Sequence, residues 1–394
     1  MRVLHVATSL SPLTGGVGTS VRTLCANLSR LGLSTEIWLT LNKHAVELDG
    51  RSRERLQQAG VQTRFFPLHP WHPLGKRYAY SPALSAALSK EISSFDLVHI
   101  HEIWLHPAAA AARACRTAGT PYLLSPCGSL DLFCLRTRWF LKLPYGFLIG
   151  RPILRSAAML HFTSPMEQKL SWTFGVRKSS IVVPRALEQA SAPETPTGTF
   201  RGRHPQIGRK RILLFVGRLH PNKRLDVVAR AFIRIAAQRE DVHLVVAGPD
   251  EGARKPAERL LAEAGVSDRV TFTGLLDDEN KLAAYRDSTL FLLPSEHESF
   301  SVAALEALAC GVPVLLSDRV ALSEWVQRAR AGSILPLNTE AWVVEALRLL
   351  DNPALLQSLG EAARRLAESE FSGPGVARKM LSVYEEILRG APQK

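Results

Sequence analysis

Two cations follow an apolar strand in the second half of the chain. The run Phe215-Val-Gly-Arg-Leu-His-Pro-Asn-Lys-Arg224 places Gly217, Arg218 and Lys223 after a predicted strand at Ile212–Val216. Cations at the carboxyl end of a buried strand are well placed to clamp a diphosphate, because both side chains donate charge-assisted hydrogen bonds to phosphate. A solvated loop with two surface cations is the alternative, and these residues alone do not exclude it.

Two glutamates flank the start of a predicted helix that follows the strand Leu290–Leu293. Glu298 precedes this helix, and Glu306 lies eight positions further on in the apolar run Ala303–Ala309. A helix N-terminus leaves backbone donors unpaired and binds anions, and here it would be formed by Ser299, Phe300 and Ser301. A buried Glu306 would need partners, which ribose or sugar hydroxyls could supply. The plainer alternative is a capping glutamate and a surface glutamate.

The first half offers a glycine-rich turn and a pair of histidines. Gly15-Gly16-Val17-Gly18 follows a predicted strand at Val3–Ala7 and opens a helix that runs to Leu31. His101 follows the predicted strand Leu97–Ile100, where it could contact a ligand or could be a hydrogen-bonded structural residue. We assign His99 to the opposite face of that strand and to a structural role.

Strand and helix patterns alternate along the whole chain, which predicts two doubly wound parallel α/β domains. Helical patterns close the chain at Thr339–Leu350, Ala354–Glu368 and Val376–Leu388. Residues 188–210 are rich in Pro, Thr, Gly and Arg and are interpreted as a linker. Further strands are predicted at Ser34–Leu39, Thr63–Phe66, Tyr122–Ser125, Met159–Phe162, Ile181–Val183, His243–Ala247, Val270–Phe272 and Pro313–Leu316.

Charge and cysteine content narrow the class of protein. Of 394 residues, the first 210 hold 26 Lys and Arg against 11 Asp and Glu, whereas the remainder holds 23 against 25. A basic half can meet nucleic acid, an anionic membrane or anionic substrates, or can be a solvated surface. Five cysteines without a CxxC pair indicate reduced thiols in a cytoplasmic protein. We expect no signal peptide and no membrane span.

Five segments, in order, resemble the motifs of retaining glycosyltransferase family 4, a family with the GT-B fold. Glu298 and Glu306 reproduce its E-x7-E motif, inside a stretch up to Pro313 that resembles its E-x-F-G…E-A-x-A-x-G-x-P-V signature. Val216–Lys223 resembles its G-R-L…K motif. Similar to its other motifs are Gly15–Gly18, Asp96–His101 with Trp104, and Tyr384-Glu-Glu-Ile.

This resemblance implies two Rossmann-like domains that face a central cleft. Residues 1–187 would form the acceptor side, 211–370 would bind the nucleotide sugar, and 371–394 would be a helix that crosses back. Arg218 and Lys223 would neutralise the donor diphosphate, Glu306 would hold the ribose hydroxyls and Glu298 the sugar ring. Gly16, with Gly15, would admit the donor from the other domain. No metal and no cofactor is expected besides the nucleotide-sugar co-substrate, because two cations and a helix terminus replace a divalent ion.

Three positions depart from the family pattern. Ser301 stands where the family usually has glycine, so the backbone there is expected to be tighter. Cys127, in Leu124–Leu130, stands where members carry His or Arg, which leaves the usual polar contact to the donor sugar unassigned. The loop Ser317–Glu324 lacks the family's glycines.

Aromatic and basic residues alternate between Arg136 and Arg155. We expect the aromatic side chains to pack on the sheet of the first domain, while Arg136, Arg138, Lys142, Arg151 and Arg155 could face an anionic membrane.

The overall expectation is transfer of a hexose-type sugar from a nucleoside-diphosphate sugar to a glycan or lipid-linked acceptor in surface polysaccharide synthesis. A nucleotide-sugar epimerase and a non-catalytic nucleotide- or RNA-binding protein stay open as alternatives. A dinucleotide dehydrogenase is disfavoured, because Gly15–Gly18 lies well past the first predicted strand rather than in a tight G-x-G-x-x-G turn.

Overall fold

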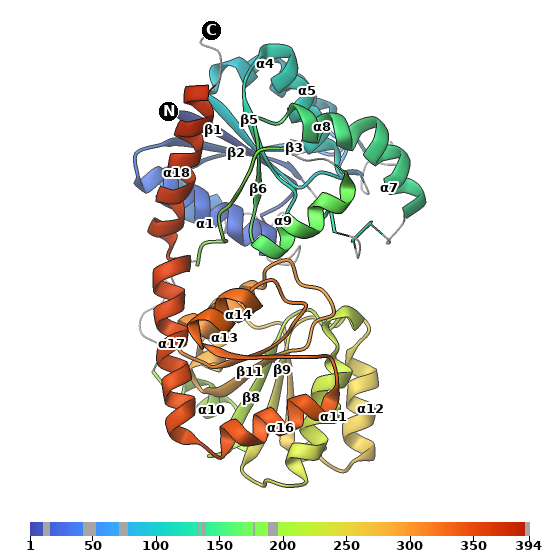
Figure 1. Ribbon diagram of the computed structural model, residues 1–394, viewed down its shortest axis with the longest axis vertical. Helices are drawn as coiled ribbons and strands as arrows, with labels where there is room; N and C mark the ends of the chain where they lie inside the picture. Colours follow the sequence, from blue (N-terminus) through green and yellow to red (C-terminus); the bar gives the residue numbers. More distant parts are fainter. Residues whose placement is uncertain are drawn as a thin grey trace. The chain divides into compact units, whose positions relative to one another are not determined.

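The chain forms two compact α/β units. A computed structural model describes residues 1–10, 16–41, 53–70, 78–131, 134–135, 139–175, 178–187 and 196–390. The first unit comprises Met1–Glu188 and Phe371–Lys394, and the second comprises Gln189–Glu370 (Figure 1). No helix among the described residues combines the length and the apolar character needed to cross a bilayer.

Within the described residues, the first unit holds a seven-stranded parallel sheet of order β3-β2-β1-β4-β5-β6-β7. The central strands β4 and β5 are buried along their whole length, whereas in the edge strand β3 Phe66 is the one buried residue. The strands are β1 (Arg2–Ala7), β2 (Ser34–Leu41), β3 (Gln62–Pro67), β4 (Leu97–His101), β5 (Tyr122–Ser125), β6 (Met159–Phe162) and β7 (Ser180–Val182).

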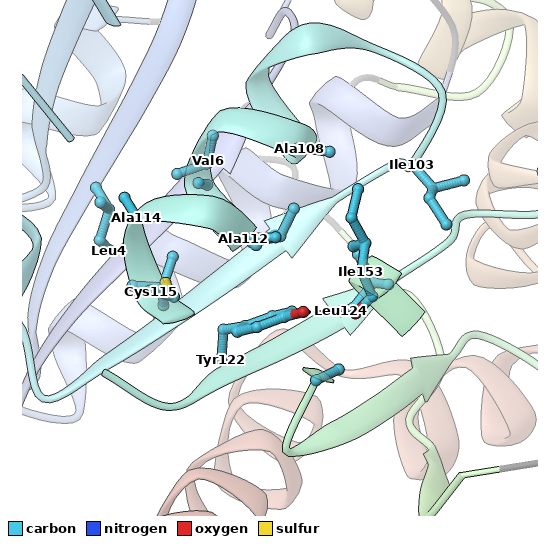
Figure 2. Close-up of a cluster of buried hydrophobic side chains, with 14 of the residues drawn as sticks. Leu4, Val6, Ile103, Ala108, Ala112, Ala114, Cys115, Tyr122, Leu124 and Ile153 are labelled. Atoms are coloured by element: carbon cyan, nitrogen blue, oxygen red, sulfur yellow. Dashed lines mark hydrogen bonds between the residues drawn. The ribbon is translucent and has the colours of Figure 1, made fainter. Parts of the chain in front are cut away.

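Helices cover both faces of this sheet. They are α1 (Gly16–Arg30), α4 (Pro82–Glu91), α5 (His106–Ala118), α7 (Trp139–Tyr145), α8 (Arg151–Ser156), α9 (Pro165–Ser171) and α18 (Gly373–Gly390), with the 3-10 turns η2 (Ile92–Ser94) and η4 (Trp172–Phe174) and the π-helical turn η3 (Gly146–Gly150). The alanines of α5 let it lie close to β1 and β5, where Tyr122 donates a 2.5 Å hydrogen bond to the Ile153 carbonyl of α8 (Figure 2). On the other face, α18 packs with α1 through Met380 and Tyr384.

The second unit repeats the architecture. Its parallel sheet, of order β10-β9-β8-β11-β12-β13 in the described residues, comprises β8 (Arg211–Val216), β9 (Val242–Ala247), β10 (Val270–Gly274), β11 (Ser288–Leu293), β12 (Val314–Ser317) and β13 (Gly332–Leu335). Its helices are α10 (Thr199–Arg203), α11 (Leu225–Ala236), α12 (Arg254–Glu263), α13 (Asp278–Arg286), α14 (Val302–Ala309), α15 (Ser323–Ala329), α16 (Thr339–Leu350) and α17 (Pro353–Phe371), with the turns η5 (Pro205–Ile207), η6 (Pro221–Lys223) and η7 (Ser267–Arg269).

Two features of the second unit were not expected from the sequence. The last strand, β13, was missed because it has only four residues and begins with glycine. A Cβ at Gly332 would lie 2.0 Å from the Val314 carbonyl oxygen, so glycine is required where these strands meet. The described part of the predicted linker, residues 196–210, is folded onto this unit, with Phe200 and Ile207 fully buried. Asp287 holds it by accepting from the backbone of Gly198 and Arg201.

Candidate functional site

The two motif segments of the second unit lie beside each other because of the strand order. β8 and β11 are neighbours in the sheet although β9 and β10 separate them in sequence. The loop with Arg218 and Lys223 leaves the carboxyl end of β8, and the segment with Glu298 leaves the carboxyl end of β11. Such a point, where the strand order reverses, is where open α/β sheets bind ligands.

Each predicted phosphate cation is paired with a carboxylate in this structure. Lys223 Nζ contacts Glu298 Oε2, and both side chains are mostly buried. Arg218 Nη1 donates to Glu251 at 2.9 and 3.1 Å, and this pair is more exposed. Pattern reasoning missed Glu251 because it follows a different strand, β9. Exposed ion pairs such as Arg218–Glu251 contribute only about 0–1 kcal/mol, so an incoming diphosphate can replace Glu251 at low cost.

Glu306 is held by two side chains of α13. Lys281 Nζ donates to Oε1 at 2.7 Å and the Tyr285 hydroxyl donates to Oε2 at 3.0 Å. Burial and the nearby Glu306 charge raise the pKa of Tyr285 well above its usual range, so its proton stays in place. A carboxylate offers about four acceptor positions. Two therefore remain for ligand hydroxyls.

Glycines allow a close backbone approach beside the Arg218 loop. A Cβ on Gly248, whose φ is +139°, would lie 1.9 Å from the Gly217 carbonyl oxygen. The close approach of the segments that follow the parallel strands β8 and β9 therefore requires glycine at position 248. By contrast, apart from its chain neighbours, a Cβ on Gly217 would meet only the Phe215 ring, at 4.0 Å, among the described residues. The fold itself therefore does not require glycine at position 217, and the side on which a Cβ would lie is open.

The start of α14 differs in detail from the expectation. The helix begins at Val302 and Ser301 is its N-cap, with the side-chain oxygen accepting from the Ala304 N–H at 3.2 Å. Ser301 has φ +82°, a region that favours glycine, which accounts for the glycine usual at this position in family 4. Phe300 is fully buried and faces Trp325, so only its backbone could reach a donor. Ser299 is half-buried.

Among the predicted residues of the first unit, His101 is buried and Cys127 is half-buried. Gly15 lies outside the described residues, and Gly16 begins α1. His101 and Cys127 line a cavity of about 30 Å³ together with Ser125, Thr163 and Arg185. A space of that volume has room for a water molecule and not for a sugar ring. Burial raises the pKa of Cys127 to about 11, so the thiol is not a nucleophile at neutral pH.

The prediction that His99 points away from His101 was wrong. Residues two apart on a strand share a face, and the two rings lie 4.2 Å apart, centroid to centroid. His5 of β1 and His161 of β6 complete a buried cluster on the same side.

The hydrogen bonds of this cluster determine its proton positions. His161 Nε2 is 2.8 Å from the Val183 carbonyl, so Nε2 must carry the proton and Nδ1 must accept. His99 Nε2 then donates to that Nδ1 at 3.3 Å, and the Tyr384 hydroxyl donates to His99 Nδ1 at 2.8 Å. The chain of bonds ties α18 to β4 and β6 through neutral imidazoles.

The cluster also has the spacing of a metal site. One nitrogen each of His5, His99 and His101 lies within 4.8 Å of the others. Both nitrogens of His99 are, however, committed to Tyr384 and His161. Binding an ion would break that chain of hydrogen bonds, so we interpret the cluster as structural.

Two further charged residues of the first unit escaped pattern reasoning. Glu102, with φ +67°, accepts from the Thr8 hydroxyl at 2.6 Å, and burial raises the pKa of its carboxyl group. Arg185 is buried beside the cavity, and its Nε has no partner among the described residues. Both follow the carboxyl ends of strands, where a family motif would have been needed to single them out.

Comparisons with known proteins agree with the two-unit organisation. Residues 15–186 match the glycosyl transferase 4-like domain, and residues 197–366 match glycosyl transferases group 1. This chain belongs to the family-4-like glycosyltransferases.

Related proteins are also named as glycosyltransferases. An MMP alpha-(1->4)-mannosyltransferase of Mycolicibacterium hassiacum is 32% identical over 195 residues, 49% of this chain and 46% of the relative. The chain likewise spans less than half the length of three D-inositol 3-phosphate glycosyltransferases that it matches. A D-inositol 3-phosphate glycosyltransferase of Acidothermus cellulolyticus is 26% identical over 98% of this chain and 90% of its own.

The fold is GT-B. The crystal structure of Anabaena HepE in complex with UDP and glucose superposes with a TM-score of 0.76, at 16% identity, over 98% of this chain and 100% of that one. Two parallel-sheet α/β units are therefore confirmed as the fold class.

Proposed function

We propose that this protein is a retaining, metal-independent glycosyltransferase. It moves a hexose-type sugar from a nucleoside-diphosphate sugar to a glycan or lipid-linked acceptor in surface polysaccharide synthesis. The observation that carries the proposal is the convergence of Lys223, Arg218 and Glu298 at the ends of the adjacent strands β8 and β11. The HepE structure, which holds UDP and glucose, supports a nucleotide-sugar donor.

In this proposal the second unit stabilises the departing diphosphate. Negative charge grows on the leaving group as the glycosidic bond breaks, so Arg218 and Lys223 act more strongly in the transition state than in the ground state. Glu298, released from Lys223, accepts hydroxyl hydrogen bonds from the sugar ring. Glu306 uses its two remaining acceptor positions for the ribose. The departing diphosphate helps take the acceptor proton, so no side chain need act as a general base.

The donor is identified by a thermal-shift screen of nucleotide sugars. A donor present far above its dissociation constant stabilises a protein by about 3 to 4 kcal/mol. Glu306→Ala should abolish most of that shift even with the free nucleoside diphosphate, because the ribose hydroxyls lose their acceptor. Arg348→Ala, on the distant helix α16, is the matched control and should shift as the parent does. Equal nucleotide binding by Glu306→Ala and parent would remove the ribose assignment.

Product analysis separates this proposal from its alternatives. The anomeric configuration of the product, read by NMR, tests retention, and activity in excess chelator tests metal independence. An epimerase would convert the nucleotide sugar without any acceptor. A non-catalytic RNA-binding protein would bind oligonucleotides with a steep salt dependence and turn over no sugar.

We further propose a cytoplasmic location at the inner face of the membrane, because the first half is strongly basic and a lipid-linked acceptor would be held there.

A further inference from the structure

A row of large apolar side chains is exposed on the segment α7–η3 of the first unit. Each of these side chains is 58–70% exposed, and we call them the apolar ridge: Trp139, Phe140, Leu141, Leu143, Phe147 and Leu148. The expectation that the aromatic residues of this segment pack on the sheet was therefore wrong for Trp139, Phe140 and Phe147. Soluble proteins rarely leave so many large apolar side chains contiguous and exposed without a binding role.

The opposite face of the same segment is already used for packing. A Cβ at the buried Gly146 would lie 2.9 Å from the ring of Phe174, and the Tyr145 hydroxyl donates to the Ile103 carbonyl at 3.0 Å. Ile153 and Leu154 of the following helix α8 are fully buried. The segment cannot turn its ridge inward without losing these contacts, so the ridge side chains stay exposed. Helix α7 itself lies at the right-hand edge of the first unit in Figure 1.

The ridge is set among positive charges. Residues 135–178 contain eight Lys and Arg and one acidic residue, Glu167. Glu167 is buried and accepts from the backbone of Gly128 and Thr163, so it presents no charge to a partner. Arg151 lies over the Phe147 ring at 5.5 Å, and Lys142 lies 5.6 Å from the centroid of Trp104. Arg136 and Arg138, which were also expected here, lie outside the described residues.

We propose that the apolar ridge inserts into the headgroup and upper acyl region of a lipid bilayer, with Lys142, Arg151 and Arg155 beside anionic headgroups. Aromatic and aliphatic side chains flanked by cations are the composition of interfacial membrane segments. A second copy of this chain fits less well, because pairing two ridges would bring like charges together. The inference rests on the proposed function only in that a lipid-linked acceptor would then be presented at the bilayer surface.

This proposal differs from purely electrostatic attachment in one measurable respect. Insertion of apolar side chains does not require lipid charge, so the full-length protein should float with neutral phosphatidylcholine vesicles. Adding phosphatidylglycerol should strengthen binding, and high salt should remove only that increment.

Two triple variants separate the contributions. Phe140→Ser/Leu143→Ser/Phe147→Ser should lower binding to both kinds of vesicle by about a hundredfold or more. Lys142→Gln/Arg151→Gln/Arg155→Gln should leave neutral binding unchanged and lower anionic binding by about a hundredfold at low salt. Val344→Ser, at an equally exposed apolar residue of α16, is the surface control and should bind as the parent does.

Depth is read separately from affinity. Lipids brominated in their upper acyl chains should quench part of the tryptophan fluorescence of the parent. Trp139→Phe should keep vesicle binding but lose part of that quenching. Quenching that is unchanged in Trp139→Phe would show that the ridge does not enter the bilayer.

Three results would overturn the proposal: a parent that floats with neither vesicle, a ridge variant that binds as the parent does, or a parent dimer that the ridge substitutions convert to a monomer without any lipid binding. Nucleotide-sugar thermal shifts of the same variants keep the two proposals apart. A protein that binds vesicles but no nucleotide sugar would disprove the proposed function and not the ridge proposal. A protein that binds a nucleotide sugar but no vesicles would disprove the ridge proposal and not the proposed function.

Discussion

The two units place polar groups on their sheets in opposite ways. In the second unit, charged side chains form ion pairs that stay partly exposed to solvent, such as Arg218–Glu251 and Lys281–Glu306. In the first unit, four imidazoles are buried, neutral and bonded to one another or to the backbone. Accessible ion pairs can exchange partners with a ligand, whereas a buried neutral network cannot do so without unfolding its surroundings. The same fold thus serves exchange in one unit and cohesion in the other.

The two units should differ most in how much stability they lose in acid. Burial lowers the pKa of His5 to about 3 and of His161 to about 4, and those of His99 and His101 also lie well below 6.5. In the unfolded chain these histidines bind protons below their ordinary pKa of about 6.5, whereas in the folded unit they stay neutral at the same pH. Stability is therefore lost as the pH falls from about 6.5. By pH 5, two such histidines cost about 4 kcal/mol together.

Amide hydrogen exchange at pH 7.5 and pH 5, corrected for intrinsic rates, would resolve this loss by unit. The second unit has His243, whose pKa burial lowers to about 4, and should lose less. The carboxyl groups of Glu102 and Glu167, whose pKa values burial raises, act with the opposite sign and will offset part of the loss in the first unit. If the second unit opened first in acid, the proposed division of roles would be wrong.

Removing an exchangeable cation should damage turnover rather than folding. Lys223→Ala and Arg218→Ala should each lower kcat about a hundredfold to a thousandfold, or about 3 to 4 kcal/mol, because the diphosphate loses a cation where its charge grows. Both variants should stay folded: the melting temperature should change little in Arg218→Ala, whose partner Glu251 reaches water, and should fall in Lys223→Ala, which leaves the mostly buried Glu298 without its cation. Arg348→Ala is the matched surface control. Normal turnover in either variant would remove that residue from the phosphate site.

Matched tyrosine substitutions compare the two kinds of polar contact directly. Tyr384→Phe leaves the buried His99 Nδ1 without its donor and should cost about 1 to 3 kcal/mol. Tyr285→Phe removes a donor to Glu306, which keeps Lys281 and reaches solvent, so its cost in stability should be smaller. Urea unfolding measures both. Equal losses would mean that burial of the network is not what makes it cohesive.

The smallest expected effect concerns the strained cap of α14. Ser301→Gly should stabilise the protein by about 0.5 to 1 kcal/mol, because relief of a positive φ outweighs the few tenths lost with the serine cap. A urea midpoint measured beside the parent checks the sign. A loss of stability would show that the hydroxyl bond to Ala304 dominates.

The local sequence pattern was sufficient to predict most of the strands. Apolar runs predicted twelve of the strands to within two residues, and the helix Thr339–Leu350 was predicted with its observed ends. It was also sufficient for Arg218, Lys223, Glu298 and Glu306 as candidates, because their segments resemble motifs whose spacing is local. β13 failed because four residues that begin with glycine carry no periodic signal.

Only the tertiary structure determined which side chains contact one another. Glu251, Lys281 and Tyr285 reach the motif residues from other strands and helices, and sequence distance says nothing of such contacts. The ridge at Trp139–Leu148 shows the limit most plainly. Its apolar residues read as core, because hydrophobicity states a preference for leaving water and not which surface provides it. Only the packing of Gly146 against Phe174, on the other side of the segment, determined that the ridge faces outward.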